Sequence, residues 1–301
     1  MKTDPKKSYS LLRLGAIVFF LAMAVYFGND VWNYYQERWE AQRNQQSLEE
    51  LYQQGESAVP GQSGASGEVV PGESKEPSVL PRYSQLVELN PDLVGWINIA
   101  QGGLSTAVVQ RDNEYYLDHD FYQKQNRHGQ IFLDERNDPA LTDDVTVLYG
   151  HNLPSDKAMF NILENYRKAD YLAQNPTFRY DTLYQEGEYA IFAVFLASTR
   201  PEHGEIFDYI NHLNFSTDQE KEAFFQEILG RSLLDTGVEV SAQDQVMLLS
   251  TCAYEFSDAR LVVAGRRLRP GEKAGDFGKD VQKAEDPLMP EIWEKMYGSG
   301  E

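Results

Sequence analysis

The chain has 301 residues and a formal net charge of −20, from 47 acidic and 27 basic residues. Proteins bind nucleic acid by neutralising phosphates with Lys and Arg, so this charge counts against a nucleic-acid partner. The single cysteine, Cys252, cannot form an intramolecular disulfide, which excludes the disulfide-rich secreted class. On count alone, a lone thiol is more often a small buried hydrophobe than a nucleophile.

The first 33 residues predict a short cytoplasmic tail and a signal-anchor transmembrane helix. An uncharged apolar run over residues 14–29 follows four basic residues, Lys2, Lys6, Lys7 and Arg13. Because the basic flank is N-terminal, the positive-inside rule predicts a single-pass protein of the cell membrane, its N-terminus cytoplasmic and the rest extracellular. The alternative is a cleaved signal peptide, since Ala22-Met23-Ala24 has the form of a cleavage site. The apolar run continues past that point, which favours the anchor.

Residues 34–79 predict a stalk and a linker. Residues 34–54 are rich in Glu, Gln, Arg and Leu and indicate an exposed helix. Residues 55–75 repeat Val-Pro-Gly among Ser, Gly and Glu, a composition that cannot bury a core and is typical of a flexible linker. We therefore expect a flexible tether between the anchor and a folded domain.

The folded domain is expected over residues 80–269, with a mainly β fold. Seven strand-like runs recur, punctuated by Gly, Asn, Asp and Pro: residues 94–99, 106–110, 129–133, 145–149, 189–198, 245–250 and 261–268. This density of strands favours a β-barrel or a sandwich. Apolar spacing predicts helices at 83–89, 158–166 and 218–229, the last with Ser216 or Thr217 as N-cap. Residues 270–301 form a polar tail that we expect to be loosely held, with one short helix near 290–296.

Cys252 ends an apolar strand, and Arg260 begins the next strand after a short loop. If the two strands pair as neighbours, the guanidinium comes close to the sulfur. A cation there favours the thiolate and can stabilise an oxyanion during acyl transfer. The alternative for Arg260 is a surface salt bridge with Asp258 or Glu255.

His151 ends another apolar strand, residues 145–150, and is followed by Asn152. A cysteine nucleophile needs a proton-transfer partner within reach, and a histidine at a second strand end can supply it. The other histidines lie in polar loop contexts and have weaker claims: His119, His128, His203 and His212.

Three motifs, which carry His151, Cys252 and Arg260 in that chain order, resemble those of sortases. Leu249-Ser250-Thr251-Cys252 with Arg260 is similar to the Thr-Leu-x-Thr-Cys…Arg signature, and Tyr149-Gly150-His151-Asn152 resembles the histidine motif. Further segments resemble class B sortases in particular: Asn90-Pro91-Asp92, Gly95-Trp96-Ile97, Asp112-Asn113, Tyr116-Leu117, residues 129–134 and Arg231-Ser232. The likeness covers residues 80–268, nearly the whole folded domain.

The resemblance implies a closed sortase-type β-barrel with peripheral helices, including a long helix between the sixth and seventh strands. It implies a cysteine transpeptidase that needs no cofactor or metal. Cys252 would cleave a C-terminal sorting signal after Thr and form a thioacyl intermediate, His151 would move the protons, and Arg260 would stabilise the oxyanion. The surface protein would then pass to an amine of a peptidoglycan precursor. By the same resemblance, Asn113, Leu117 and Ser250 would line the signal-binding groove.

Other functions remain open from the residues. A papain-like protease places its cysteine before its histidine, the reverse of the order here, and the two motif residues of an L,D-transpeptidase lie much closer together. Within the class B resemblance, the enzyme could polymerise pilins instead of anchoring proteins to the wall. A non-catalytic, membrane-anchored surface-binding protein with an inert Cys252 is the alternative from a different class.

Overall fold

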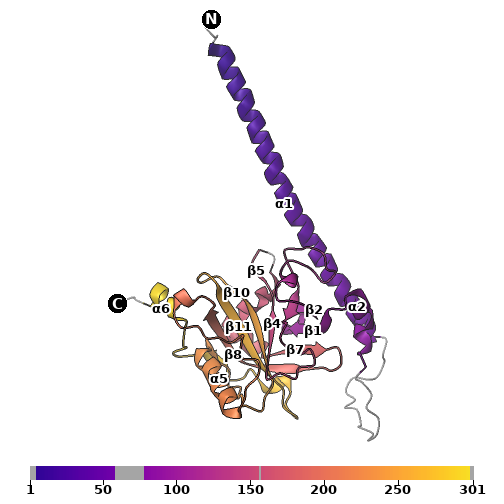
Figure 1. Ribbon diagram of the computed structural model, residues 1–301, viewed down its shortest axis with the longest axis vertical. Helices are drawn as coiled ribbons and strands as arrows, with labels where there is room; N and C mark the ends of the chain where they lie inside the picture. Colours follow the sequence, from indigo (N-terminus) through magenta and orange to yellow (C-terminus); the bar gives the residue numbers. More distant parts are fainter. Residues whose placement is uncertain (1–4, 58–77, 156, 299–301) are drawn as a thin grey trace. The chain divides into compact units, whose positions relative to one another are not determined.

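The computed structural model describes residues 5–57, 78–155 and 157–298, without the side chains of 5–13, 101 and 102 (Figure 1). The chain divides into two units, Met1–Asn44 and Gln45–Glu301. The helices longer than one turn are α1 (Pro5–Ser57), α2 (Ser84–Leu89), α4 (Ala169–Gln174), α5 (Asp218–Arg231) and α6 (Glu291–Tyr297), with a single turn at α3 (Ala100–Gly103). The 3-10 helices are η1 (Pro81–Tyr83), η2 (Tyr115–Leu117), η3 (Phe160–Arg167), η4 (Pro201–His203) and η5 (Ala274–Asp276).

Eight strands close into a barrel in the order β1-β2-β3-β4-β10-β11-β8-β7. They are β1 (Leu93–Ile99), β2 (Leu104–Val109), β3 (Ile131–Leu133), β4 (Val145–Tyr149), β7 (Thr177–Thr182), β8 (Glu188–Ser198), β10 (Val246–Ala253) and β11 (Ala259–Arg267). Two small antiparallel pairs lie outside it: β5 (Asn152–Leu153) with β6 (Ala158–Met159), and β9 (Leu234–Asp235) with β12 (Gln282–Lys283). Full closure leaves the barrel sheet without an open edge.

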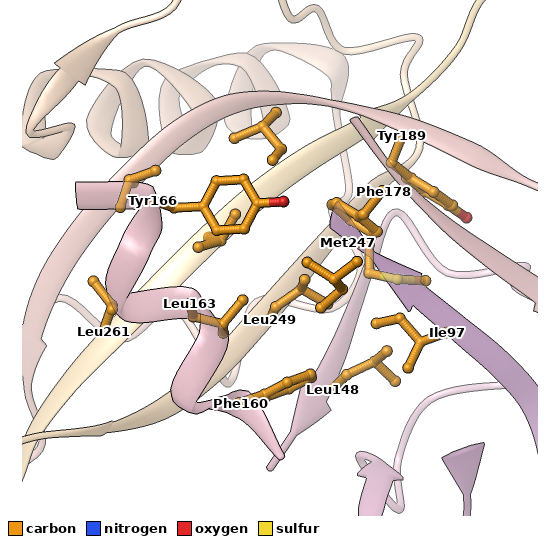
Figure 2. Packing of buried hydrophobic residues seen from close by; sticks show 14 of the residues in the cluster. Ile97, Leu148, Phe160, Leu163, Tyr166, Phe178, Tyr189, Met247, Leu249 and Leu261 are labelled. Atoms are coloured by element: carbon orange, nitrogen blue, oxygen red, sulfur yellow. The ribbon is translucent and has the colours of Figure 1, made fainter. Parts of the chain in front are cut away.

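Strand β10 begins with four apolar residues and is buried at every position but Cys252, because the barrel wall is covered on both sides. Side chains alternate between the faces of a strand, so Met247 and Leu249 enter the barrel interior, whereas Val246 and Leu248 pack outside beneath α5. Figure 2 shows Met247 and Leu249 in the same cluster as Phe160 of η3. This alternation decides which face each functional side chain occupies.

The predicted long helix is confirmed as α5, which lies beside β8 (Figure 1). In chain order β8 is the sixth barrel strand and β10 the seventh, as the resemblance implies. Thr217 is the N-cap, since its Oγ1 accepts a hydrogen bond from the Glu220 N–H at 3.2 Å. The fold class is therefore the closed, mainly β barrel expected from the sequence.

Several local expectations differ from the structure. Strand β7 was not anticipated, because only Phe178 and Tyr180 alternate with polar residues in its short sequence TFRYDT. Residues 158–166 form a short strand and then the 3-10 helix η3 instead of one α-helix, and the left-handed backbone of Met159 (φ 52°) separates the two. The tail is not loosely held: β12 pairs with β9, and partly buried side chains near α6 pack against the barrel cluster.

The folded domain also begins earlier than residue 80, because its compact unit starts at Gln45 within α1. Leu48 and Tyr52 of that helix are buried, and the Tyr52 ring stacks on Trp96 of β1 with centroids 4.4 Å apart. The sparse apolar residues of this polar segment predicted an exposed stalk. Instead, Leu48 and Tyr52 are residues with which α1 packs on the barrel.

Upstream of Gln45, α1 carries the predicted membrane segment. Leu14–Ser57 is long and apolar enough to cross a membrane by length and composition, and its most apolar window is fully exposed. A signal sequence passes the same test. The structure therefore agrees with an N-terminal membrane segment.

Candidate active site

Cys252 and Arg260 lie directly opposite each other on neighbouring strands. Antiparallel pairing of β10 with β11 continues through Cys252↔Arg260 to Ala253↔Ala259. Directly opposed residues in an antiparallel pair have Cβ atoms about 4.5–5.5 Å apart and project from the same face. The expected juxtaposition of thiol and guanidinium follows from this register.

His151 reaches the same place from the other side of β10. Strand β4 runs parallel to β10 with Ser250 opposite Tyr149, and Gly150 N–H donates to Ser250 O at 3.3 Å. His151 lies two residues after Tyr149, and Cys252 lies two residues after Ser250. The cysteine therefore lies between the histidine and the arginine across β4, β10 and β11.

All three side chains belong to the outer face of the barrel. Cys252 shares its face of β10 with Leu248, and Arg260 shares its face of β11 with Val262, both in the cluster under α5. Gly150 faces inward, where any Cβ would strike Phe160, so His151 faces outward. The three residues form one surface group at the ends of their strands.

The imidazole of His151 is held by a backbone carbonyl. Its Nε2 lies 2.6 Å from Leu117 O, so Nε2–H donates and Nδ1 is the nitrogen left for proton exchange. Leu117 was expected to line the groove with its side chain, which is 42% exposed. In the structure its backbone carbonyl orients the histidine.

Asn152 ties the histidine segment to the cysteine strand. Its Nδ2 donates to Cys252 O at 2.9 Å and to Glu164 Oε1 at 2.8 Å, and its Oδ1 accepts from Asn161 Nδ2 at 2.6 Å. Its carbonyl accepts from the Tyr254 hydroxyl at 2.6 Å. The sequence placed Asn152 in a motif but gave it no role, because its partners come from two other segments, η3 and the end of β10.

Arg260 makes no ion pair within the described ranges, and its Nη1 donates to Ala259 O at 3.1 Å. Both partners expected under the salt-bridge reading are engaged elsewhere: Asp258 pairs with Arg200, and Glu255 pairs with Arg167. The guanidinium therefore keeps donors for a ligand beside the thiol.

Tyr209 is a buried neighbour of the site that the sequence did not reveal. Its hydroxyl lies 2.8 Å from Ser250 Oγ. Burial raises the pKa of Tyr209 to about 12, and the charges of Arg260 and Cys252 also act on it. Ser250 therefore lies beneath the outer face, joined to Tyr209, and is 2% exposed. Tyr209 follows η4 in an irregular loop, where no periodicity marks it.

Among the residues that the structure describes, no hydrogen bond joins Asn113 to this group. Its Oδ1 accepts from the Glu135 N–H at 2.9 Å, joining the loops that follow β2 and β3. Within the described chain, no cluster of three or more His, Cys, Asp or Glu side chains could hold a metal ion.

A hollow of about 290 Å³ lies beside the group, next to the end of β8. Its lining consists of Ser198, Thr199 and residues 206–211, Tyr209 among them. Ala197, the residue before Ser198, pairs with Arg260 across β8 and β11. A larger cavity of about 590 Å³, lined by Tyr52, Phe178 and Phe277 among others, lies away from these strand ends. Of these two, the smaller hollow is the one next to the strand that pairs with Arg260.

Comparison with known proteins identifies the family. The chain is 31% identical to Sortase B of Staphylococcus aureus over 194 residues, which cover 64% of this chain and 76% of that protein. It is 34% identical to Sortase B of Listeria monocytogenes over 191 residues, 62% of this chain and 74% of that protein. No protein-family profile matches the chain.

Solved structures agree with this relationship. The Staphylococcus aureus sortase B–substrate complex superposes with a TM-score of 0.64 at 26% identity, covering 78% of this chain and 99% of that one. Sortase B from Bacillus anthracis in complex with AAEK1 gives 0.63 at 27% identity over the same shares. The barrel, the order of its strands and these relatives lead to one conclusion: the chain belongs to the sortase B family and is a sortase-type cysteine transpeptidase.

Proposed function

We propose that this transpeptidase cleaves a C-terminal sorting signal after Thr and transfers the surface protein to a cell-wall amine. The observation that carries the proposal is the register of β4, β10 and β11, in which Cys252 lies between His151 and Arg260 on one face. A thiol flanked by a proton carrier and an unpaired cation suits acyl transfer.

In the first step, the Cys252 thiolate attacks the carbonyl carbon of the Thr, forming an S–C bond and a tetrahedral oxyanion. Arg260 faces the developing negative charge and stabilises it. As the C–N bond breaks, His151 gives its proton to the leaving amine, and the thioacyl enzyme remains. His151 Nδ1 fits this role because Nε2 is engaged with Leu117 O.

In the second step, an incoming amine attacks the thioacyl carbonyl. His151 takes a proton from the amine, the S–C bond breaks, and Cys252 leaves as the thiolate. Neither step calls for a metal or cofactor, because charge and protons stay with these three side chains. The hollow beside Arg260, with Ser250 beneath it, would receive the signal residues before the Thr, while Leu117 would border the opposite side.

Relatives support both substrates. One solved neighbour is a sortase B–substrate complex, and another is sortase B complexed with triglycine. We therefore expect an acyl donor and an amine acceptor for this chain. A pilin with such a signal and a lysine amine would react by the same chemistry, so wall anchoring and pilus assembly differ only in the acceptor.

The same proposal places the enzyme outside the cell, held by the apolar part of α1 with its N-terminus in the cytoplasm.

The test uses the full chain in detergent with a panel of signal peptides that differ before the Thr. We expect mass spectrometry to find a thioacyl adduct on Cys252, released by added amine. Cys252→Ala should abolish the adduct and the cleavage. Cleavage that survives in Cys252→Ala would refute the proposal, and a wild type without adduct or cleavage would favour the non-catalytic alternative.

A further inference from the structure

The C-terminal segment, residues 281–297, runs from the outer end of α5 to the loops around the active site. β12 pairs with β9, and the Leu288 N–H donates to Gly230 O at the end of α5, at 2.8 Å. Met289, Ile292 and Trp293 then pack against the barrel cluster, which includes Phe256 of the β10–β11 loop. The segment is therefore anchored along its length, including the first turn of α6.

Helix α6 contacts two loops at once. The Tyr297 hydroxyl donates to Glu255 O at 2.9 Å, in the loop between Cys252 and Arg260. Glu291 Oε1 accepts from the Glu205 N–H at 3.0 Å, in the loop that follows β8. Gly204 in that loop has φ 116°, and any Cβ there would strike the Glu291 side chain.

These two loops border the proposed signal site. The first carries Cys252 and Arg260 at its ends, and the second continues into residues 206–211, which line the hollow. The loops also touch each other: Arg200 pairs with Asp258, and His203 packs edge-on against Phe256 with ring centroids 5.7 Å apart. The β10–β11 loop, the loop after β8 and α6 therefore each contact the other two.

We propose that residues 281–297 are a positioning strap, in which α6 joins the β10–β11 loop to the loop after β8 and so fixes the position of the signal-binding hollow relative to Cys252 and Arg260. The inference rests on the proposed function, because it assigns the hollow to the sorting signal. Fixing the hollow in advance relative to the reacting thiol lowers the ordering cost of binding a peptide. The strap therefore acts on signal affinity and selectivity, while the reacting groups stay those of the strand ends.

The experiment compares Tyr297→Phe, Glu291→Ala and the double variant with wild type, as full chains in detergent. Tyr297→Phe keeps the ring beside Trp293, where the centroids are 4.6 Å apart, and removes only the hydroxyl. Glu294→Ala is the matched control, because Glu294 is exposed on the same helix. Each single variant should raise KM for the signal peptide about threefold to fivefold with kcat within twofold, in line with one hydrogen bond. The double variant should raise KM about tenfold.

Hydrogen exchange supplies a readout that needs no turnover. In the double variant, exchange should quicken in residues 199–211 and 253–258 but not in the barrel strands, while the control matches wild type. Unchanged KM and exchange in the double variant would overturn the strap, and so would exchange that quickens evenly across the barrel. If wild type cleaves no signal, the proposed function fails, and the exchange arm still decides whether the strap holds these loops.

Discussion

Asn152 follows the histidine and is buried between two strand ends, so its replacement tests how the site is assembled. Asn152→Ala removes the donors to Cys252 O and Glu164 and the acceptor for Asn161 Nδ2. Glu164 keeps Arg167 as a partner at 3.1 Å, whereas the Cys252 carbonyl loses this side-chain donor. The perturbation thus falls on the link between the two catalytic strands.

The magnitude follows from the bonds that are lost. At about 1 kcal/mol for each of two unreplaced hydrogen bonds, the stability loss is about 2 kcal/mol. For a unit of this size, that corresponds to about 4–8 °C in Tm. A shift of His151 relative to Cys252 of up to about 1 Å would slow thioacyl formation roughly 10- to 100-fold.

The assay is single-turnover adduct formation on Cys252 with the best signal peptide, together with a thermal melt of the full chain. Asn152→Asp is the sharper variant, because it keeps the shape but turns a carboxylate toward Glu164 and the Cys252 carbonyl. It should be slower and less stable than Asn152→Ala. Asn161→Ala is the control, since it loses one bond to Asn152 and none to Cys252. Wild-type rate and Tm in Asn152→Asp would refute the reasoning.

Four further outcomes are expected. Tyr209→Phe should slow signal cleavage about tenfold by releasing Ser250, and the pH–rate profile should keep its basic limb, because the raised pKa of Tyr209 (about 12) leaves it neutral below that range. Asp181→Asn should be about 1 kcal/mol more stable than wild type at pH 7, which chemical denaturation would measure. The reason is that burial raises the pKa of this fully buried carboxyl, so that its ionised form opposes folding. That gain should vanish as the pH falls below the folded-state pKa, where wild-type Asp181 is protonated. Burial raises the pKa of Asp244, but hydrogen bonds from Arg269 and Ser241 outweigh burial and lower the pKa overall. The stability that ionised Asp244 contributes at pH 7 should therefore be lost as the pH falls below about 4. An acid titration of Asp244→Asn should lack that loss. Tyr52→Ala should cost about 3 kcal/mol in a thermal melt, whereas Gln53→Ala, on the exposed side of the same helix, should cost almost nothing.

The barrel was predictable where strands alternate or run apolar. β4, β8, β10 and β11 are such runs, and together they carry or flank the cysteine, histidine and arginine. β7 was harder to predict, since Phe178 and Tyr180 are the two aromatic residues among its six, while Asp181 and Thr182 are polar yet buried in the barrel. Local pattern thus located the strands of the site better than the strand that closes the barrel.

Within the site, sequence could indicate residues at strand ends but not residues brought in by loops. Cys252 and Arg260 are joined by a short loop, so their pairing followed from chain order alone. Tyr209 and α6 reach the site from loops and a tail whose paths depend on tertiary packing. Such contacts leave no periodic trace, and this explains why the expectation of a loosely held tail was wrong.

Tertiary contacts also bear on the expected role of the Gly- and Pro-rich residues 55–75, which were predicted to be a flexible tether. It was expected to separate the anchor from the catalytic domain, yet the chain on both sides of residues 58–77 belongs to one unit. Before it, Tyr52 stacks on Trp96 and Gly55 packs directly against the Arg82 backbone; after it, the Leu80 N–H donates to Leu183 O at 2.7 Å. Residues 58–77 themselves lie outside the described ranges, but because the chain before and after them belongs to the same unit, their length does not set the reach between the apolar run and that unit. The chain that separates the apolar run from the catalytic unit is therefore residues 30–44 of α1, and a change in their length would bear on access to membrane-bound substrates where a change in residues 58–77 would not.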